Sequence, residues 1–401
     1  MQKILLLIAS LFYFNFILAE NEIKSWQGIH ETPLSCLEQQ FAEPPVEFAN
    51  HVIWGWEGKM DKKTICNDLD SIKKKGFRAV IFEAGYKLPF KYLSEEWFKA
   101  IRTGVLEAKK RGMKVWIIDE GKYPSGFAGG KFSQERPDLR MQALVIGDTI
   151  QIKRGEVMTN HKIAPEIISA VAVSTSGAPN RTVEINNGKI SFNAGLDDWK
   201  ILLVKSDFRT AVTRAVNNPN GGKDATNSLC DYLNPVAVQQ FIDWTHKQYK
   251  KYLGKELGTT VLGFRGDEPD YAHLPWTPSI VQTFKDTKGY DPTPYLASFF
   301  TASPTIQEQR VKADYWDVWS SLFATHFFKL QADWCAANGV AHITHLNKEH
   351  EMPACVKAEG DYFRALSKVQ IPGVDAIWNQ IWPSTLNDFP KLASSVAHVY
   401  G

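Results

Sequence analysis

Carboxylates follow short apolar runs at several points of the chain. Glu83, Asp119-Glu120 and Asp267-Glu268 each stand directly after a run that is rich in β-branched and aromatic residues. Hydrolysis of a glycosidic bond requires one carboxyl group to protonate the leaving oxygen and another to activate water or attack the sugar. Acids that recur at strand ends therefore indicate chemistry of this kind.

Glu268 is the strongest catalytic candidate. It ends the run Gly263–Pro269, in which Asp267 and Glu268 are adjacent and Pro269 stops regular structure. Neighbouring side chains of a strand face opposite ways, so only one of the pair need point into a site, and Asp267 is expected to contact substrate. The alternative is a structural acid that pairs with Arg265. We favour the catalytic interpretation because strand-end carboxylates in barrels are more often catalytic than structural.

The glycine-rich segment 119–131 is a second candidate site. Lys131 lacks the spacing and the following Ser or Thr of a phosphate loop, and Ser125 lacks the G-x-S-x-G context of an esterase nucleophile. A loop that contacts substrate through Glu120 and Tyr123 fits better, and ordinary turn chemistry is the alternative.

His345 and Glu349 follow another predicted strand. We expect His345 to donate hydrogen bonds to sugar hydroxyls, and Glu349 is the candidate for the second catalytic carboxylate. The spacing of His342, His345 and His350 matches no zinc motif, so zinc is disfavoured. Carboxylate oxygens are the ligands that calcium prefers, so calcium stays open as a cofactor.

Aromatic residues accompany these acids. The chain has 13 Trp, and Trp56 and Asn379 stand at the ends of the first and last predicted strands. Trp offers a large flat surface for the C–H face of a sugar. We expect Trp56 and Asn379 to contact substrate, while most of the other Trp residues pack in the core.

The elements that must position these residues follow a repeated pattern. Gly76, Gly112 and Gly339 each stand just past an amphipathic helix, where a left-handed cap is favourable, and a short apolar run follows. Helices that alternate with such runs indicate parallel βα units. The predicted strands are His51–Trp56, Phe77–Phe82, Lys114–Ile118, Thr260–Gly266, Val340–His345 and Val374–Ile377.

The predicted fold is of the α/β class, an incomplete (β/α)₈ TIM-type barrel with about six βα units. A doubly wound sheet would show a glycine fingerprint for phosphate after its first strand, and the run His51–Trp56 has none. Active sites of barrels lie at the C-terminal ends of the strands, which is where the acids stand.

A long segment after the third predicted strand breaks this alternation. Runs of β-branched residues separated by turn signals such as Asn187-Gly188 predict a small β-rich insertion. The expected organisation is a signal peptide (1–19), a lead segment (20–50), a first barrel part (51–140), the insertion (141–225) and a second barrel part (226–401) whose last strands are missing.

The N-terminus has the features of an export signal. Lys3 is followed by the apolar run Ile4–Leu18, and Ala19 is a small residue at the expected cleavage point. No later stretch is long and apolar enough to span a bilayer. We therefore expect a periplasmic or extracellular protein without membrane insertion.

Charge and motifs narrow the possible partners. The chain has 46 basic and 44 acidic residues, a net charge of +2, and no basic stripe, which argues against nucleic acid. No motif indicates a nucleotide or redox cofactor. A carbohydrate is the expected partner, and the sequence leaves the oligomeric state open.

Several motifs, in order, resemble glycoside hydrolase family 106, the α-L-rhamnosidase family. The resemblance begins near Phe41 and continues to the end of the chain. The matching segments are Tyr123–Lys131, Arg136–Met141, Asp231–Pro235, Asp267–Pro269, Trp334-Cys335, Gly360-Asp361, Ile371–Asp375 and Lys391–Gly401.

The resemblance implies an inverting hydrolase, often calcium-dependent, that acts on terminal rhamnose in polysaccharides. It places a catalytic acid in the segment Asp267–Pro269, which points to Glu268. It also implies further strands after Gly401, the first ending in a functional glutamate, and then β-sandwich domains. A glycosidase for a different sugar, and a non-catalytic carbohydrate-binding barrel fragment, are the alternatives.

Overall fold

The computed structural model describes residues 33–44, 46, 49–215, 225–271, 273–377, 380–381 and 388–400. The predicted signal peptide and Asn379 lie outside these residues. None of the described helices is long and apolar enough to cross a membrane.

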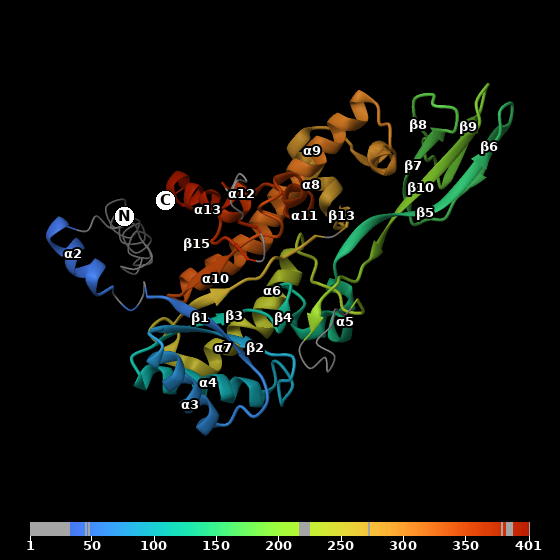
Figure 1. Ribbon diagram of the computed structural model, residues 1–401. Coiled ribbons are helices and arrows are strands. Elements are labelled where there is room, and N and C mark those ends of the chain that lie inside the picture. The colour runs from blue at the N-terminus through green and yellow to red at the C-terminus, as the bar shows by residue number, and fades with distance from the viewer. Residues whose placement is uncertain are drawn as a thin grey trace, which may run out of the picture.

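A six-stranded parallel sheet forms the centre of the molecule (Figure 1), in the order β1-β2-β3-β12-β14-β15. Its strands alternate along the chain with helices, which confirms the α/β class and the predicted number of parallel strands. In the described part of the chain, β1 and β15 end the sheet and do not pair with each other. The strands are β1 (His51–Trp56), β2 (Ala79–Ala84), β3 (Lys114–Ile118), β12 (Val261–Arg265), β14 (Ala341–Thr344) and β15 (Ile371–Pro372).

The last strand is displaced from its predicted position. The sequence predicts a strand over Val374–Ile377, but β15 is Ile371–Pro372 and residues 373–377 have no regular structure. The reason is the short partner strand. β14 ends at Thr344, which pairs with Pro372 and accepts a final hydrogen bond from Gly373, so no ladder remains for the residues beyond.

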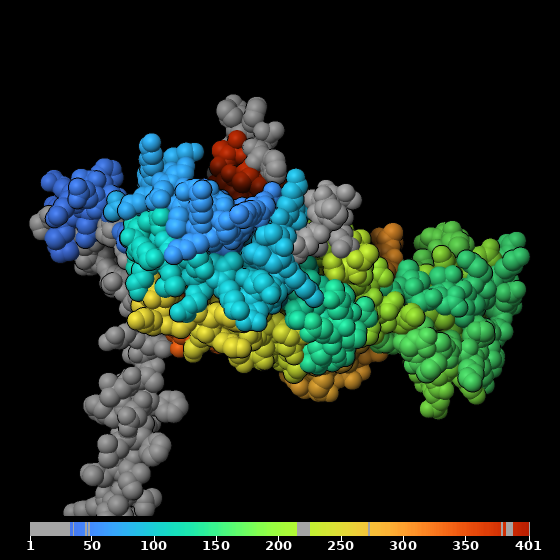
Figure 2. Space-filling view, turned by 90° about the horizontal axis from the view of Figure 1, so that it is seen from below, coloured from blue at the N-terminus to red at the C-terminus, as the bar shows by residue number. Residues whose placement is uncertain are grey.

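The two faces of the sheet differ in what covers them. One face packs against α3 (Lys62–Lys74), α4 (Glu95–Lys110) and α7 (His246–Leu253), which Figure 2 shows from outside. The opposite face carries a much smaller apolar cluster. The two faces therefore bury very different amounts of apolar side chain. The first face carries Val80, Phe82, Val115, Ile117 and Phe264, and the second carries Ile81, Trp116, Ile118, Leu262 and Ala341.

Of the remaining helices, α2 precedes β1, α5 follows β3, α6 lies before β12, and α8 to α13 follow β12. The helical segment from Pro235 to Leu253 is divided into α6 and α7 at Thr245, whose φ and ψ of −110° and −87° interrupt it. The helices are α2 (Leu34–Ala42), α5 (Lys131–Glu135), α6 (Pro235–Trp244), α8 (Ile280–Lys288), α9 (Ile306–Phe323), α10 (Lys329–Ala337), α11 (Met352–Glu359), α12 (Tyr362–Leu366) and α13 (Phe389–Tyr400).

An antiparallel sheet between β3 and β12 projects from the main body (Figure 1), with the order β13-β5-β10-β7-β8. β13 comes from the segment after β12 and pairs with β5, so this segment holds the projection to the body. β6 and β9 form a separate pair. β6 has little apolar signal in the sequence, since all but one of its residues are exposed and only Val157 and Met158 are apolar. The strands are β5 (Gln142–Ile152), β6 (Val157–Lys162), β7 (Ile167–Ser174), β8 (Arg181–Thr182), β9 (Lys189–Asn193), β10 (Trp199–Phe208) and β13 (Pro275–Trp276).

Gly263 permits the close pairing of β12 with its neighbours. A Cβ at this position would lie 1.9 Å from the carbonyl oxygen of Ala341 and 2.6 Å from the Trp116 ring. Gly263→Ala should therefore lower the free energy of unfolding by about 2 kcal/mol or more, because a backbone oxygen cannot move aside without opening the sheet. Gly55→Ala, in edge strand β1, is the matched control, since its nearest contact is an ordinary 3.4 Å. Thermal unfolding compares the two, and equal effects would contradict this account of the sheet.

Candidate active site

His345, the first residue after β14, is the centre of a buried polar cluster. Its Nε2 lies 3.4 Å from Asp267 Oδ1, 3.6 Å from Glu268 Oε1 and 3.8 Å from Asp375 Oδ2. Arg265 Nη2 approaches Nδ1 of the same ring at 3.4 Å. Burial lowers the pKa of His345, but the nearby carboxylates outweigh it, so its pKa is raised overall. The ring therefore binds a proton more readily than an isolated histidine does.

Glu268 is held in an unusual backbone conformation. Its φ is +37°, which is rare for a residue with a side chain and typical of functional sites when it occurs. Burial raises the pKa of its carboxyl. The nearby His345 and Tyr123 lower that pKa by more, so the net shift is downward. A carboxylate kept ionised in this way is suited to stabilise positive charge or accept a proton, and poorly suited to donate one.

Asn347 connects a second group of acids to the first. Its Nδ2 donates to Asp270 Oδ2 at 3.0 Å and lies 3.4 Å from Tyr123 Oη, while its backbone N–H donates to Glu359 Oε1. Burial raises the pKa of Asp270 and of Glu359. Sequence reasoning missed Asp270, because it follows Pro269 in a loop where strand periodicity gives no signal.

Asp270 lines two cavities. The smaller, of about 300 Å³, is also bounded by Tyr123, Arg214 and Asn347. The larger, of about 860 Å³, is also bounded by Lys348. Tyr123 is held at the smaller cavity by β4 (Lys122–Tyr123), which pairs with β11 (Arg214–Ala215). A ligand could place one group in each cavity. A carboxyl group between the cavities could then protonate the oxygen that joins the two groups.

Glu120 organises its own loop and does not reach a substrate surface. Its carboxylate accepts hydrogen bonds from the backbone N–H groups of Gly121, Phe127, Ala128 and Gly129 at 2.5–2.9 Å. Its side chain is fully buried. Burial raises the pKa of Glu120 to about 7, and the four amides oppose this rise. These contacts give Glu120 a structural role in its own loop.

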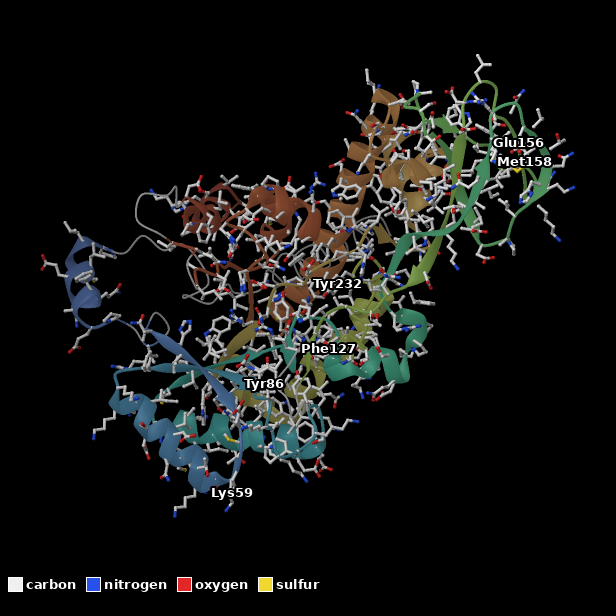
Figure 3. The ribbon with its side chains drawn as sticks, turned by 45° about the vertical axis from the view of Figure 1, so that its right-hand side comes forward. Lys59, Tyr86, Phe127, Glu156, Met158 and Tyr232 are labelled. Carbon is white, nitrogen blue, oxygen red and sulfur yellow. The ribbon has the colours of Figure 1, made fainter. Side chains whose placement is uncertain are left out.

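Ser125 fastens this loop to the segment after β12. Its Oγ donates to Asp119 Oδ1 at 2.6 Å and accepts from the Asp267 N–H at 2.7 Å. Tyr232 Oη donates to the Ser125 carbonyl at 2.5 Å. Figure 3 shows Tyr232 and Phe127 in the interior between the parallel sheet and the C-terminal helices. The loop and the Asp267-Glu268 pair are thus one connected unit.

Of the other predicted site residues, Trp56 and Glu349 are both buried. Trp56 is fully buried among the helix-side aromatics, with its ring centroid 5.0 Å from Phe82 and 5.8 Å from Trp97, so it offers no face to a sugar. Glu349 is 2% exposed and accepts the backbone N–H of Asp375, and burial raises its pKa to about 7. Asn379 lies outside the described residues.

Glu268, His345 and Asp375 could hold a metal ion. One ligand atom from each lies within 4.8 Å of the others. The buried His345 Nε2 makes no hydrogen bond within the described part of the chain. Two carboxylates and one imidazole fit a divalent cation, and the nitrogen ligand suits a transition metal better than calcium, which prefers oxygen. The spacing of histidines in the sequence gave no signal for this group, because its members come from three separate strand ends.

The chain resembles known glycoside hydrolases in sequence and in fold. The model of the α-L-rhamnosidase family, glycoside hydrolase family 106, matches residues 170–401. The structure of a rhamnosidase from Novosphingobium sp. PP1Y superposes with a TM-score of 0.60 at 14% identity, covering 85% of this chain and 49% of that one. An α-amylase from Geobacillus thermoleovorans gives a TM-score of only 0.29 at 13% identity, over 80% of this chain and 53% of that one.

One curated relative also matches. It is named "Putative beta-glucuronidase", comes from Formosa agariphila and is 24% identical over 421 residues. The match covers 91% of this chain and 34% of the relative. The chain thus spans about a third of that relative and about half of the solved rhamnosidase.

Glu120→Gln tests the structural role of the loop carboxylate. The substitution replaces one acceptor oxygen by a donor that faces backbone N–H groups, so the free energy of unfolding should fall by about 2–4 kcal/mol. Glu135→Gln is the control, because this exposed residue of α5 only pairs with Lys131 on the surface and should change stability by roughly 0.5 kcal/mol or less. Denaturant unfolding measures both. An unchanged midpoint for Glu120→Gln would refute the role.

Proposed function

The chain belongs to glycoside hydrolase family 106, and on that premise we propose that it is an α-L-rhamnosidase that removes terminal rhamnose from a polysaccharide. The observation that carries this proposal is the family match over more than half of the chain. The group of acids at the ends of β12 and β14, next to two cavities, supports it. We further propose that the parallel sheet is part of a (β/α)₈ barrel and that the protein is exported.

Asp270 is the proton donor in this proposal. It lines both cavities, so a glycosidic oxygen that joins a sugar in one to a sugar in the other passes beside its carboxyl. The Asn347 amide donates to Oδ2, and Oδ1, which is buried and makes no hydrogen bond within the described part of the chain, is left to carry the proton. This assignment moves the donor two residues along the chain from Glu268, the residue that the sequence favours.

Glu268 is the ionised partner. His345 lies 3.6 Å from its carboxylate and keeps it charged, which suits a group that activates water in an inverting reaction or balances positive charge on the sugar. Glu349, the second catalytic candidate from the sequence, acts instead on the position of Asp375, through the hydrogen bond from the Asp375 backbone N–H.

A divalent cation fits the group of Glu268, His345 and Asp375. Bound there, it would supply positive charge that polarises sugar hydroxyls. His345 and Asp375 would hold it, and Glu268 would then be shared between the cation and the substrate.

A β-glucuronidase is the second candidate, supported by the name of the relative from Formosa agariphila. Chromogenic α-L-rhamnoside and β-glucuronide substrates, offered in parallel, separate the two. A folded chain that hydrolyses neither but retains sugars would be a carbohydrate-binding protein.

Dependence on the leaving group tests Asp270 as the donor. Asp270→Asn should reduce kcat/KM on a rhamnosyl disaccharide by about 100-fold or more, because a sugar alkoxide needs a proton to leave. The loss on a nitrophenyl rhamnoside should be much smaller, since nitrophenolate leaves without one. Glu268→Gln should impair both substrates similarly, and Asp286→Asn, on the exposed side of α8, should change neither. An equal loss on both substrates in Asp270→Asn would remove Asp270 from this role.

Cation binding is testable by thermal unfolding. Calcium, manganese or zinc at 100 times its dissociation constant should stabilise the chain by about 2.7 kcal/mol, and a chelator should reverse the effect. Asp375→Asn should abolish the shift, while Asp333→Asn, in a surface pair with Lys329, should retain it. A shift that survives Asp375→Asn would place the ion elsewhere.

A further inference from the structure

The C-terminal ends of α3, α4 and α7 lie together at the edge of the parallel sheet where the strands begin. Each helix leads into the next strand through a short turn, which contains Gly76, Gly112 or Gly254, so its last residues are at this edge. The candidate active site lies at the opposite edge. The three helices are neighbours along one face of the sheet (Figure 1). We define their ends as the basic rim, which comprises residues 70–78, 107–114 and 250–256.

Contacts between the helix ends make the basic rim continuous. Lys73 Nζ donates to the Arg111 carbonyl at 2.6 Å, and Arg111 pairs with Asp70 at 2.7 Å, which joins the ends of α3 and α4. Lys109 pairs with Glu256 at 2.8 Å, which joins α4 to the turn after α7. The rim is therefore one surface rather than three separate helix ends.

The basic rim carries far more positive than negative charge. It holds nine lysines and two arginines against three acids, whereas the whole chain has 46 basic and 44 acidic residues. Two of the acids, Glu107 and Glu256, are buried and already paired with Lys110 and Lys109. Cations suit helix C-termini, but three helix ends together carry only about 1.5 negative charges. Capping of the helices therefore accounts for a small part of the positive excess.

The unbalanced charge is spread along the whole rim. Four of its lysines are exposed and make no ion pair with any described residue, namely Lys74, Lys75, Lys251 and Lys255. They stand on α3 at one end of the rim and on and after α7 at the other. The rim lines neither of the two cavities beside Asp270. Point charges spread over three helix ends, rather than gathered in a cavity, suit an extended anionic surface.

We propose that the basic rim binds the anionic headgroups of a phospholipid bilayer and turns the candidate active site away from the membrane. The place where the chain enters the fold favours a bilayer over other polyanions. The apolar run Ile4–Leu18 predicts passage through a membrane, and the following chain reaches the sheet at the rim, where the Arg78 N–H donates to the Asn50 carbonyl just before β1. Each lysine close to an anionic leaflet strengthens binding about 5-fold, and clusters of about four to eight basic residues are enough.

Binding to lipid vesicles tests the proposal. Sedimentation of the full chain would use vesicles of phosphatidylcholine alone and vesicles that also contain phosphatidylglycerol. The measured quantity is the ratio of the two partition coefficients, because any contribution of the apolar run Ile4–Leu18 is common to both. This ratio should be roughly 100 or more at low salt. It should fall towards one at about 0.5 M salt, where exposed charges are screened within a few ångströms.

Charge-removal variants locate the membrane-binding surface. Replacing the four unpaired rim lysines by Gln should lower the ratio by roughly 100-fold. A matched control removes four exposed lysines of the projecting β-rich segment, so that the net charge of the chain falls equally, and this control should keep the wild-type ratio within about 5-fold. The two variants are Lys74→Gln/Lys75→Gln/Lys251→Gln/Lys255→Gln and Lys153→Gln/Lys162→Gln/Lys189→Gln/Lys200→Gln.

The outcomes do not depend on which sugar the protein hydrolyses. A wild-type ratio near one, or equal losses in the two quadruple variants, would overturn the proposal. Retention on duplex DNA or on polygalacturonate without a preference for anionic vesicles would assign the rim to another polyanion and overturn it as well. Thermal unfolding of both variants should match that of the wild type, because the substituted lysines make no ion pair with any described residue.

Discussion

The position of β12 between β3 and β14 is the constraint on which the site depends. Parallel pairing places the C-terminal ends of these strands at one edge, so that Asp119, the Asp267-Glu268 pair and His345 meet there although more than two hundred residues separate the first from the last. The pairing requires Gly263, because the neighbouring backbone leaves no room for a side chain. The order of the strands in the sheet, rather than a local sequence motif, thus brings the site residues together.

Several acids close together at one edge of the sheet repel one another. The structure offsets this repulsion differently for each acid, through a different hydrogen-bonding or charged partner. Glu120 is satisfied by four backbone amides, Glu268 by the His345 ring, and Asp270 by an asparagine amide. These environments have different chemical consequences. An acid surrounded by its own loop is structural, and one beside the His345 ring stays ionised. Asp270 keeps its proton more easily because burial raises its pKa by more than the Asn347 amide lowers it. The roles follow from the partners rather than from the acids themselves.

Much of the fold could be predicted from the sequence, but only part of the difference in role between the acids could. Apolar runs and glycine caps predicted the parallel strands, because burial on both faces leaves a strong signal. The same signal could not separate Glu120 from Glu268, since both follow a strand and only the path of the next loop decides which carboxylate is enclosed. Trp56 follows a strand but faces the helices, which the sequence does not reveal, and Asp270 was missed because loop residues have no periodicity. The lysines of the basic rim stand at three separate helix ends, and only the folded chain gathers them.

The central claim is that the bond to be cleaved crosses beside Asp270 from one cavity to the other. The most direct test is a crystal structure of the Asp270→Asn variant with an uncleaved rhamnosyl disaccharide. The account predicts one sugar ring in each cavity, with the glycosidic oxygen within hydrogen-bond distance of the amide that replaces the carboxyl. Both rings in a single cavity, or a glycosidic oxygen that faces Glu268 instead, would contradict it.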